Sequence, residues 1–169
     1  MLHIYKASAG SGKTFTLAYE YIKLLLGIKG TDGKYRLNSS ARGENHRSIL
    51  AVTFTNKATE EMKRRILHEL AVLANMEPGW TKPSPYIGKL CAEFSATEEQ
   101  VRRASELALK NLLMDFSYFS VSTIDAFFQV ILRTFAREAE LTGNYELELD
   151  NDKAIEFGVN ELFSWLNND

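Results

Sequence analysis

The spacing of apolar residues predicts that most of this chain is helical. Over residues 14–26 and again over residues 56–74, apolar side chains recur every three or four positions. That interval places them on one face of an α-helix. Thr97 and Gln100 lie three residues apart before another such run, which is the spacing of a helix-capping box. The same pattern predicts further helices at residues 85–94, 97–114, 124–135 and 152–167.

The last of these helices, residues 152–167, is amphipathic, and we expect its apolar face to pack inward. The helix at residues 124–135 has a broad apolar face as well. The side chains expected to point inward from the last helix are Ile155, Val159, Leu162, Phe163 and Leu166.

Three short apolar runs predict β-strands, and a loop and a helix follow each of them. They are residues 2–6, residues 48–54 (SILAVTF) and residues 118–122. The second run is continuously apolar enough for a strand buried on both faces. The repeated order of strand, loop and helix predicts an α/β fold with a parallel sheet flanked by helices. Residues 145–149 alternate and predict an edge strand or hairpin arm.

Residues 27–47 interrupt this pattern. The segment holds four glycines, is mostly polar and shows no hydrophobic period. Connections of this length are usually functional or disordered, so we expect a mobile loop. A second interruption, residues 77–85, is rich in proline and glycine and separates two helices.

Composition and charge narrow the function classes. The 169 residues are 45% hydrophobic and 25% charged, with a net charge of −2, so any contact with nucleic acid must come from a local patch. Cys91 is the single cysteine and excludes an internal disulfide. His3, His46 and His68 lie far apart and do not form a zinc motif. No apolar stretch approaches the length of a membrane span or a signal peptide, so we expect a cytoplasmic protein.

Residues 7–14, ASAGSGKT, follow the first predicted strand and open the first predicted helix. This is the context of a P-loop, whose backbone N–H groups hold the phosphates of a nucleoside triphosphate at a helix N-terminus. Lys13 would reach the β- and γ-phosphates, and the Thr14 hydroxyl would ligate Mg²⁺. The strict motif has glycine where this chain has Ala7. The predicted nucleotide-binding residues are Ala9, Gly10, Ser11, Gly12, Lys13 and Thr14.

Residues 49–66, ILAVTFTNKATEEMKRRI, closely resemble motif Ia of superfamily 1 helicases of the UvrD/RecB type. In that family the turn after the strand touches the single DNA strand being translocated. The resemblance therefore implies DNA contact by Phe54, Thr55 and Asn56, with Lys57 near the phosphates. An aromatic ring can stack on a base of any identity, which suits contact without sequence reading.

The residues of this segment also allow a structural interpretation. Phe54 would then be a core side chain, Asn56 a helix N-cap, and residues 63–65 (KRR) a solvated helix face.

Residues 119–128, FSVSTIDAFF, resemble the motif Ib region of the same helicases. Relatives usually read Thr-Ile-His-Ser-Phe, whereas this chain has Asp125 and Ala126 at the third and fourth positions. The resemblance leaves Thr123 as the expected DNA contact. Ser122 and Asp125 are alternatively spaced as a helix-capping pair.

The resemblance covers roughly residues 2–141 and implies an incomplete RecA-like P-loop motor domain that uses ATP and Mg²⁺. Residues 142–169 form a largely helical tail, the expected start of a helical insertion. The implied function is that of an ATP-dependent DNA helicase in DNA repair and recombination, with single-stranded DNA and the remaining motor domains as partners. The acidic pair that such a motor needs is not legible, since the segments ending at Asp115 and Asp150 lack its pattern. We therefore expect part of a longer motor, inactive alone.

Two other function classes remain open from the sequence. A small P-loop kinase also begins with strand, P-loop and helix, but it needs an arginine-rich lid, for which residues 27–47 offer Arg36, Arg42 and Arg47. A non-catalytic assembly module with a vestigial P-loop is the third class. We also expect self-association of the chain, because unpaired strand edges recruit partners.

Overall fold

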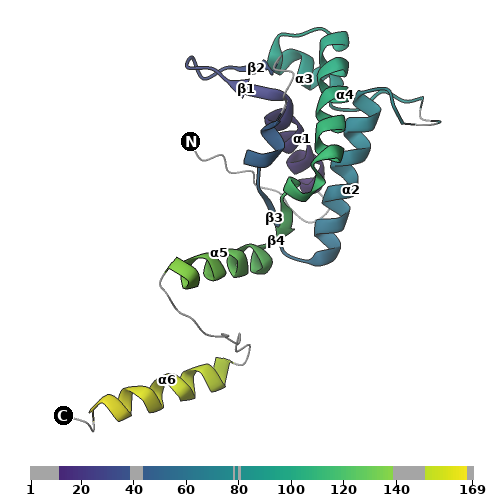
Figure 1. Ribbon diagram of the computed structural model, residues 1–169. Coiled ribbons are helices and arrows are strands. Elements are labelled where there is room, and N and C mark those ends of the chain that lie inside the picture. The colour runs from purple at the N-terminus through teal and green to yellow at the C-terminus, as the bar shows by residue number, and fades with distance from the viewer. Residues whose placement is uncertain (1–11, 39–43, 78, 80, 139–150, 167–169) are drawn as a thin grey trace. The chain divides into compact units, whose positions relative to one another are not determined.

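Helices form most of the chain that the computed structural model describes, which is residues 12–38, 44–77, 79, 81–138 and 151–166 (Figure 1). The chain divides into two compact units, one up to Gln129 and one from Val130 onward, and each is described by itself. The predicted strands at residues 2–6 and 145–149 lie outside the described residues.

All six predicted helices are confirmed, with ends that shift by a few residues. The N-cap Thr97 accepts a hydrogen bond from the Gln100 N–H (3.3 Å) and donates its own N–H to the Gln100 side chain (2.9 Å), so the capping box is present. The helices are α1 (Lys13–Leu26), α2 (Asn56–Leu73), α3 (Ile87–Phe94), α4 (Glu98–Met114), α5 (Ile124–Glu138) and α6 (Asn151–Leu166).

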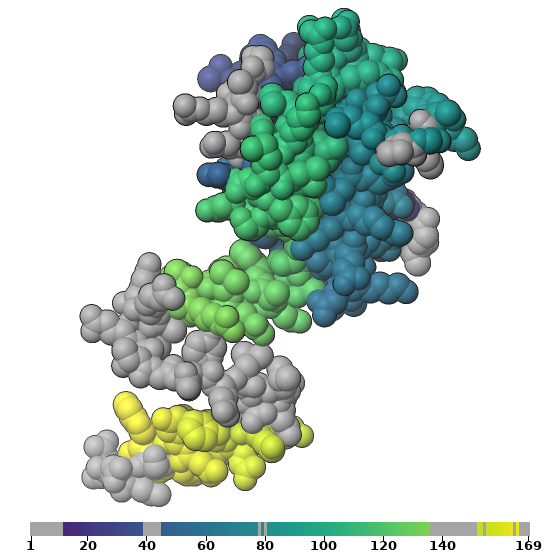
Figure 2. All heavy atoms as spheres, turned by 45° about the vertical axis from the view of Figure 1, so that its right-hand side comes forward, coloured from purple at the N-terminus to yellow at the C-terminus, as the bar shows by residue number. Residues whose placement is uncertain are grey.

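The core of the first unit lies among α1, α2 and α4, and α3 closes one end of it (Figure 1). Figure 2 shows α2 and α4 packed against each other along their lengths. The apolar stripe of α2 is buried as its sequence period predicts. In α1, Leu17 and Leu24 are exposed, although the same period predicts that they face the core with Tyr21 and Leu25. The fully buried residues include Ile22 and Leu26 of α1, Ile66 and Leu70 of α2, Leu90 of α3, and Val101 and Leu112 of α4.

The prediction of a mobile loop over residues 27–47 is wrong for the part that the structure describes. β1 (Gly27–Lys29) and β2 (Tyr35–Leu37) form an antiparallel hairpin, and η1 (Glu44–Ser48) is a 3₁₀ helix. Asp32 and Gly33 make the hairpin turn, in which Gly33 has φ 79° and the Lys34 N–H donates to the Asp32 carboxylate (3.1 Å). An Asp-Gly pair is a strong turn signal, and it outweighs the missing hydrophobic period.

The parallel sheet contains two described strands, β3 (Ala51–Thr53) and β4 (Val121–Thr123), with Thr53 paired to Thr123. Both are shorter than predicted, and β4 begins late because η2 (Phe116–Tyr118) forms a 3₁₀ turn ahead of it. Burial of residues 48–54 on both faces is also wrong here. Val52 is exposed, since α2 packs on one side of the strand and no described element covers the other.

The inward orientation predicted for α6 is wrong in the described second unit. Ile155, Val159, Leu162 and Phe163 are all exposed, while the side chain of Leu166 lies outside the description. The apolar pattern predicts the helix correctly, but no described element of that unit packs against its apolar face. Within the same described residues, no helix has both the length and the apolar character needed to cross a membrane.

Candidate functional site: the P-loop helix and two threonine turns

Gly12 sets the start of the P-loop helix. Its backbone lies in the left-handed region (φ 77°, ψ 25°), which L side chains rarely adopt, and its carbonyl accepts the Thr16 N–H at 2.9 Å. Gly12 has no side chain with which to cap α1, and the first turn has no acidic residue. The N–H groups at this end are therefore directed at whatever lies beyond the helix.

Lys13 and Thr14 form the first turn of α1. Lys13 is exposed and Thr14 is half-buried. A cation and a hydroxyl beside a positive helix end are the donor set that a magnesium–triphosphate group requires, so the described residues fit this ligand. The other predicted phosphate-binding residues, Ala9, Gly10 and Ser11, lie outside the described residues, and binding by all six stays a prediction.

The motif Ia turn joins β3 to α2 and presents an aromatic ring. Phe54 is 86% exposed, so it is not the core side chain that the structural interpretation required. The N-cap of α2 is Thr55, whose hydroxyl accepts the Ala58 N–H at 3.2 Å, so the alternative of Asn56 as the cap is also wrong. Asn56 and Lys57 follow in the first turn of α2, and both are exposed.

Two threonines that the sequence analysis did not single out hold this turn. The hydroxyl groups of Thr53 and Thr59 lie 2.6 Å apart, and each lies 3.2 Å from the Thr55 carbonyl oxygen. This network fixes the backbone on both sides of Phe54. The signal for it was the short spacing of threonines from the end of the strand into the helix.

The motif Ib turn lies at the same edge of the sheet. Because β3 and β4 are parallel and Thr53 pairs with Thr123, both turns follow the carboxyl ends of neighbouring strands. The Thr123 hydroxyl accepts the Ala126 N–H at 3.2 Å, so Thr123 caps α5. The alternative of Ser122 and Asp125 as the capping pair is therefore wrong. Thr123 itself is half-buried.

A family model for the UvrD/REP helicase N-terminal domain matches residues 3–166. The chain belongs to this family. The family implies the P-loop NTPase fold, of which the structure describes α1, the pair β3–β4 and the flanking helices.

Curated relatives of this helicase domain are RecB subunits. RecBCD enzyme subunit RecB of Escherichia coli (strain K12) is 33% identical over 153 residues, which cover 89% of this chain and 12% of the relative. The subunit of the same name from Haemophilus influenzae is 29% identical over 170 residues, which cover 96% of this chain and 13% of the relative. The RecB subunit of Buchnera aphidicola subsp. Schizaphis graminum is 43% identical over 65 residues, which cover 38% of this chain and 5% of the relative. The chain thus spans about an eighth of the length of the first two relatives.

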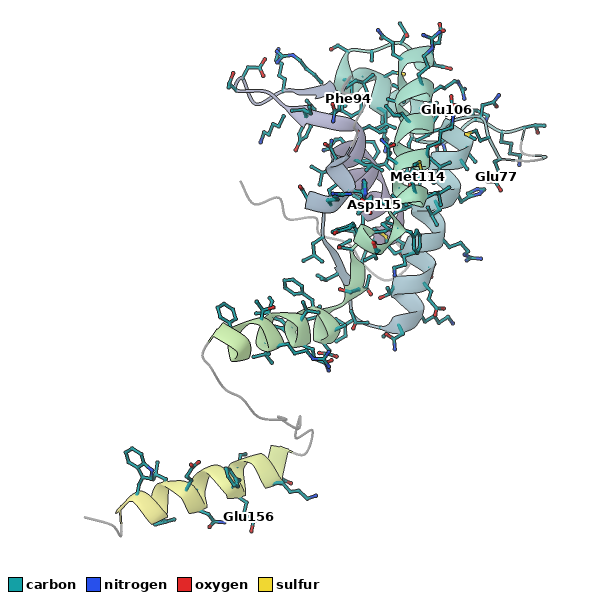
Figure 3. All side chains as sticks on the ribbon, viewed as in Figure 1. Glu77, Phe94, Glu106, Met114, Asp115 and Glu156 are labelled. Atoms are coloured by element: carbon teal, nitrogen blue, oxygen red, sulfur yellow. The ribbon has the colours of Figure 1, made fainter. Side chains whose placement is uncertain are left out.

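The acidic residue Asp115 of the helicase domain has a structural role. It ends α4 (Figure 3), and its carboxylate lies 2.5 Å from the Arg47 guanidinium and 3.3 Å from Nε2 of the buried His46. These contacts join η1 to α4. That Asp115 is not part of a magnesium-binding acidic pair stays a prediction. Asp150, the other rejected residue, lies outside the described chain.

Proposed function

We propose that this chain is the N-terminal, nucleotide-binding part of a longer ATP-dependent DNA helicase that acts in DNA repair in the cytoplasm. Residues 1–141 would be a partial RecA-like motor domain, and residues 142–169 the beginning of a helical insertion. The RecB name of the relatives, together with the family, supports a DNA-directed motor. Single-stranded DNA and the remaining motor domains would be its partners.

The observation that carries the proposal is the exposed ring of Phe54 at the carboxyl edge of β3–β4. The ring is 86% exposed, so it is accessible to a ligand, and covering it would remove apolar surface from water. Ligands of open α/β sheets bind at this edge, and a base stacks on a ring without being identified. Phe54 would therefore hold a base of single-stranded DNA.

The groups around Phe54 suit the sugar-phosphate backbone of the same strand. The Thr55 and Thr123 hydroxyls accept helix N–H bonds, which leaves each O–H proton free to donate to a phosphate oxygen. Asn56 would add an amide donor and Lys57 a positive charge. None of these contacts depends on base identity, as a translocating motor requires.

At the nucleotide site, Ala9 to Gly12 would hold the ATP phosphates by backbone N–H groups, Lys13 would neutralise their charge, and Thr14 would bind Mg²⁺. Phosphoryl transfer from ATP would supply the free energy for the motor, and the chain's residues would bind and orient the ATP. We expect the chain by itself to bind nucleotide without useful turnover, because the family's acidic pair is not in its sequence.

The kinase alternative loses support from the segment that would be its lid. Arg36 pairs with Asp32 at 2.5 Å within the hairpin, and Arg47 pairs with Asp115 at 2.5 Å. Both arginines thus have acidic partners within the described chain. Arg42 lies outside the described residues.

The test measures ATP hydrolysis by the longer gene product with and without single-stranded DNA. We expect stimulation by DNA, and Lys13→Ala should lower kcat at least about 10²-fold, the usual cost of removing one charge-stabilising donor. Lys110→Ala is the matched control, since Lys110 forms only an exposed ion pair with Glu106. The proposal would be contradicted by an ATP hydrolysis rate that is the same with and without DNA. Phosphoryl transfer to a small acceptor, or full activity of Lys13→Ala, would contradict it as well.

A further inference from the structure

Tyr86 is a fully buried tyrosine to which the sequence analysis gave no role. It lies directly before α3, and its hydroxyl donates a hydrogen bond to the Phe15 carbonyl oxygen at 2.9 Å. Phe15 belongs to the first turn of α1 and immediately follows Lys13 and Thr14. Tyr86 is therefore hydrogen-bonded to the backbone of the turn that carries Lys13 and Thr14, the predicted phosphate and magnesium contacts.

Aromatic contacts also join Tyr86 to α1. The Tyr86 ring centroid lies 4.5 Å from that of Phe15 and 5.7 Å from that of Tyr19, one turn further along α1. The Lys89 ammonium group lies 5.6 Å and 5.8 Å from the centroids of these two α1 rings. Ring pairs at such distances attract each other beyond simple burial. The first two turns of α1 are thus held by the segment before α3 and by α3 itself.

The other side of Tyr86 is attached to α2, the helix that begins at the motif Ia turn. The Tyr86 N–H donates to the Ser84 hydroxyl at 3.2 Å, and that hydroxyl donates to the Glu69 carboxylate at 2.7 Å. Burial, with a smaller effect of Glu69, raises the pKa of Tyr86 to about 12, while the charge of Arg65 on α2 and its hydrogen bond to the Tyr86 side chain oppose the rise. The hydroxyl therefore keeps its proton at neutral pH and remains a hydrogen-bond donor.

We propose that Tyr86 is a positioning residue that transmits movement between the DNA-contacting helix α2 and the nucleotide-contacting first turn of α1. The inference rests on the proposed function, since it needs both ligands. A dense interior cannot absorb a shift of α2 locally. A shift that keeps the Glu69–Ser84 bond must carry Tyr86 with it, and the Phe15 carbonyl then moves or loses its hydrogen bond. A movement of the Phe15 carbonyl shifts Lys13 and Thr14, and loss of the bond releases the turn that carries them.

The test uses the longer gene product and compares two tyrosines. Tyr86→Phe keeps the ring and removes the hydroxyl that bonds the Phe15 carbonyl of α1 and the Arg65 side chain of α2. Tyr21→Phe is the matched control on α1 itself, because the Tyr21 hydroxyl is buried and has no partner among the described residues. The readouts are the stimulation of ATP hydrolysis by single-stranded DNA, as a ratio of kcat with and without DNA, and the melting temperature.

We expect Tyr86→Phe to lower the stimulation ratio about threefold to tenfold, the range that one neutral hydrogen bond supports. Tyr21→Phe should leave the ratio unchanged. Ser84→Ala, which cuts the link to Glu69, should lower the ratio in the same direction, and Ser84→Thr should restore it.

Three results separate the possible failures. An unchanged ratio in both Tyr86→Phe and Ser84→Ala overturns the inference and leaves the proposed function intact. An equal loss of kcat with and without DNA, together with a lower melting temperature, shows a merely structural role and also overturns it. If the unmodified protein shows no stimulation by DNA, the proposed function fails, and the inference fails with it.

Discussion

Helices α2 and α6 carry the same kind of apolar stripe, but only α2 buries it. In α2 the stripe of Met62, Ile66, Leu70 and Leu73 lies in the core. In α6 the corresponding stripe, Ile155, Val159 and Leu162, is exposed. Both sequences satisfy the helical period, so the period predicts the helix and the face that seeks a partner. It does not say whether the partner is present, which depends on residues distant in the chain.

The largest effect that separates the two helices is on stability. Ile66 is completely buried and Ile155 is 64% exposed. We expect Ile66→Ala to lower the free energy of unfolding of the chain by about 2–5 kcal/mol, because it leaves a cavity in the core. Ile155→Ala should change it by less than about 0.5 kcal/mol.

Urea unfolding followed by circular dichroism measures both. The helix propensity change is the same in the two variants, so it cancels in the comparison. Equal costs would show that α6 buries its stripe in solution, and the contrast between the two helices would then disappear.

Phe54 is one of several exposed apolar side chains in the first unit, and it sharpens the comparison because it lies in a turn at the carboxyl edge of β3–β4. If its exposure serves ligand binding, Phe54→Ala in the longer gene product should weaken binding of single-stranded DNA by about 1–3 kcal/mol, the worth of one base stack. The melting temperature should not change, because most of the Phe54 ring surface is exposed and few side chains pack against it. Fluorescence anisotropy with a labelled oligonucleotide measures the affinity.

Met114→Ala is the control for Phe54, since Met114 is 87% exposed and is the last residue of α4, outside both turns. It should leave DNA affinity unchanged. A loss of stability in Phe54→Ala with unaltered DNA affinity would instead assign Phe54 to packing.

The smallest expected effect concerns self-association of the chain, which stays a prediction. The exposed stripe of α6 gives two copies a surface to share, and Phe163→Glu should weaken their association by about 1 kcal/mol, since only part of the ring is buried on pairing. Asn160→Glu adds the same charge elsewhere on α6 and should have no such effect. Sedimentation velocity over a range of concentrations compares them. A monomer at every concentration would remove this prediction.

Several local features of the candidate site follow from the sequence. The P-loop spacing identified Lys13 and Thr14, and the structure places both in the first turn of α1 behind a left-handed Gly12. The motif Ia resemblance singled out Phe54, and the ring is exposed. These features are local, because a few neighbouring residues set a turn, a cap or a helix start. The hairpin at residues 27–37 is local too: its signal is the Asp32-Gly33 pair, whereas the prediction of a mobile loop rested on the absent hydrophobic period.

Other features depended on contacts between distant segments. Residues 48–54 read as a strand buried on both faces, yet Val52 is exposed because burial depends on what packs against the strand. Ser122 and Asp125 had capping spacing, but Thr123 caps α5, since the register against β3 decides where the strand ends. Tyr86 lies more than 70 positions from Phe15, and their hydrogen bond has no local signature. Sequence therefore determined the helices and the start of α1 at Lys13, because short-range geometry suffices for them. Only tertiary packing decided which faces are buried, that the Phe54 ring is exposed, and which helices are joined.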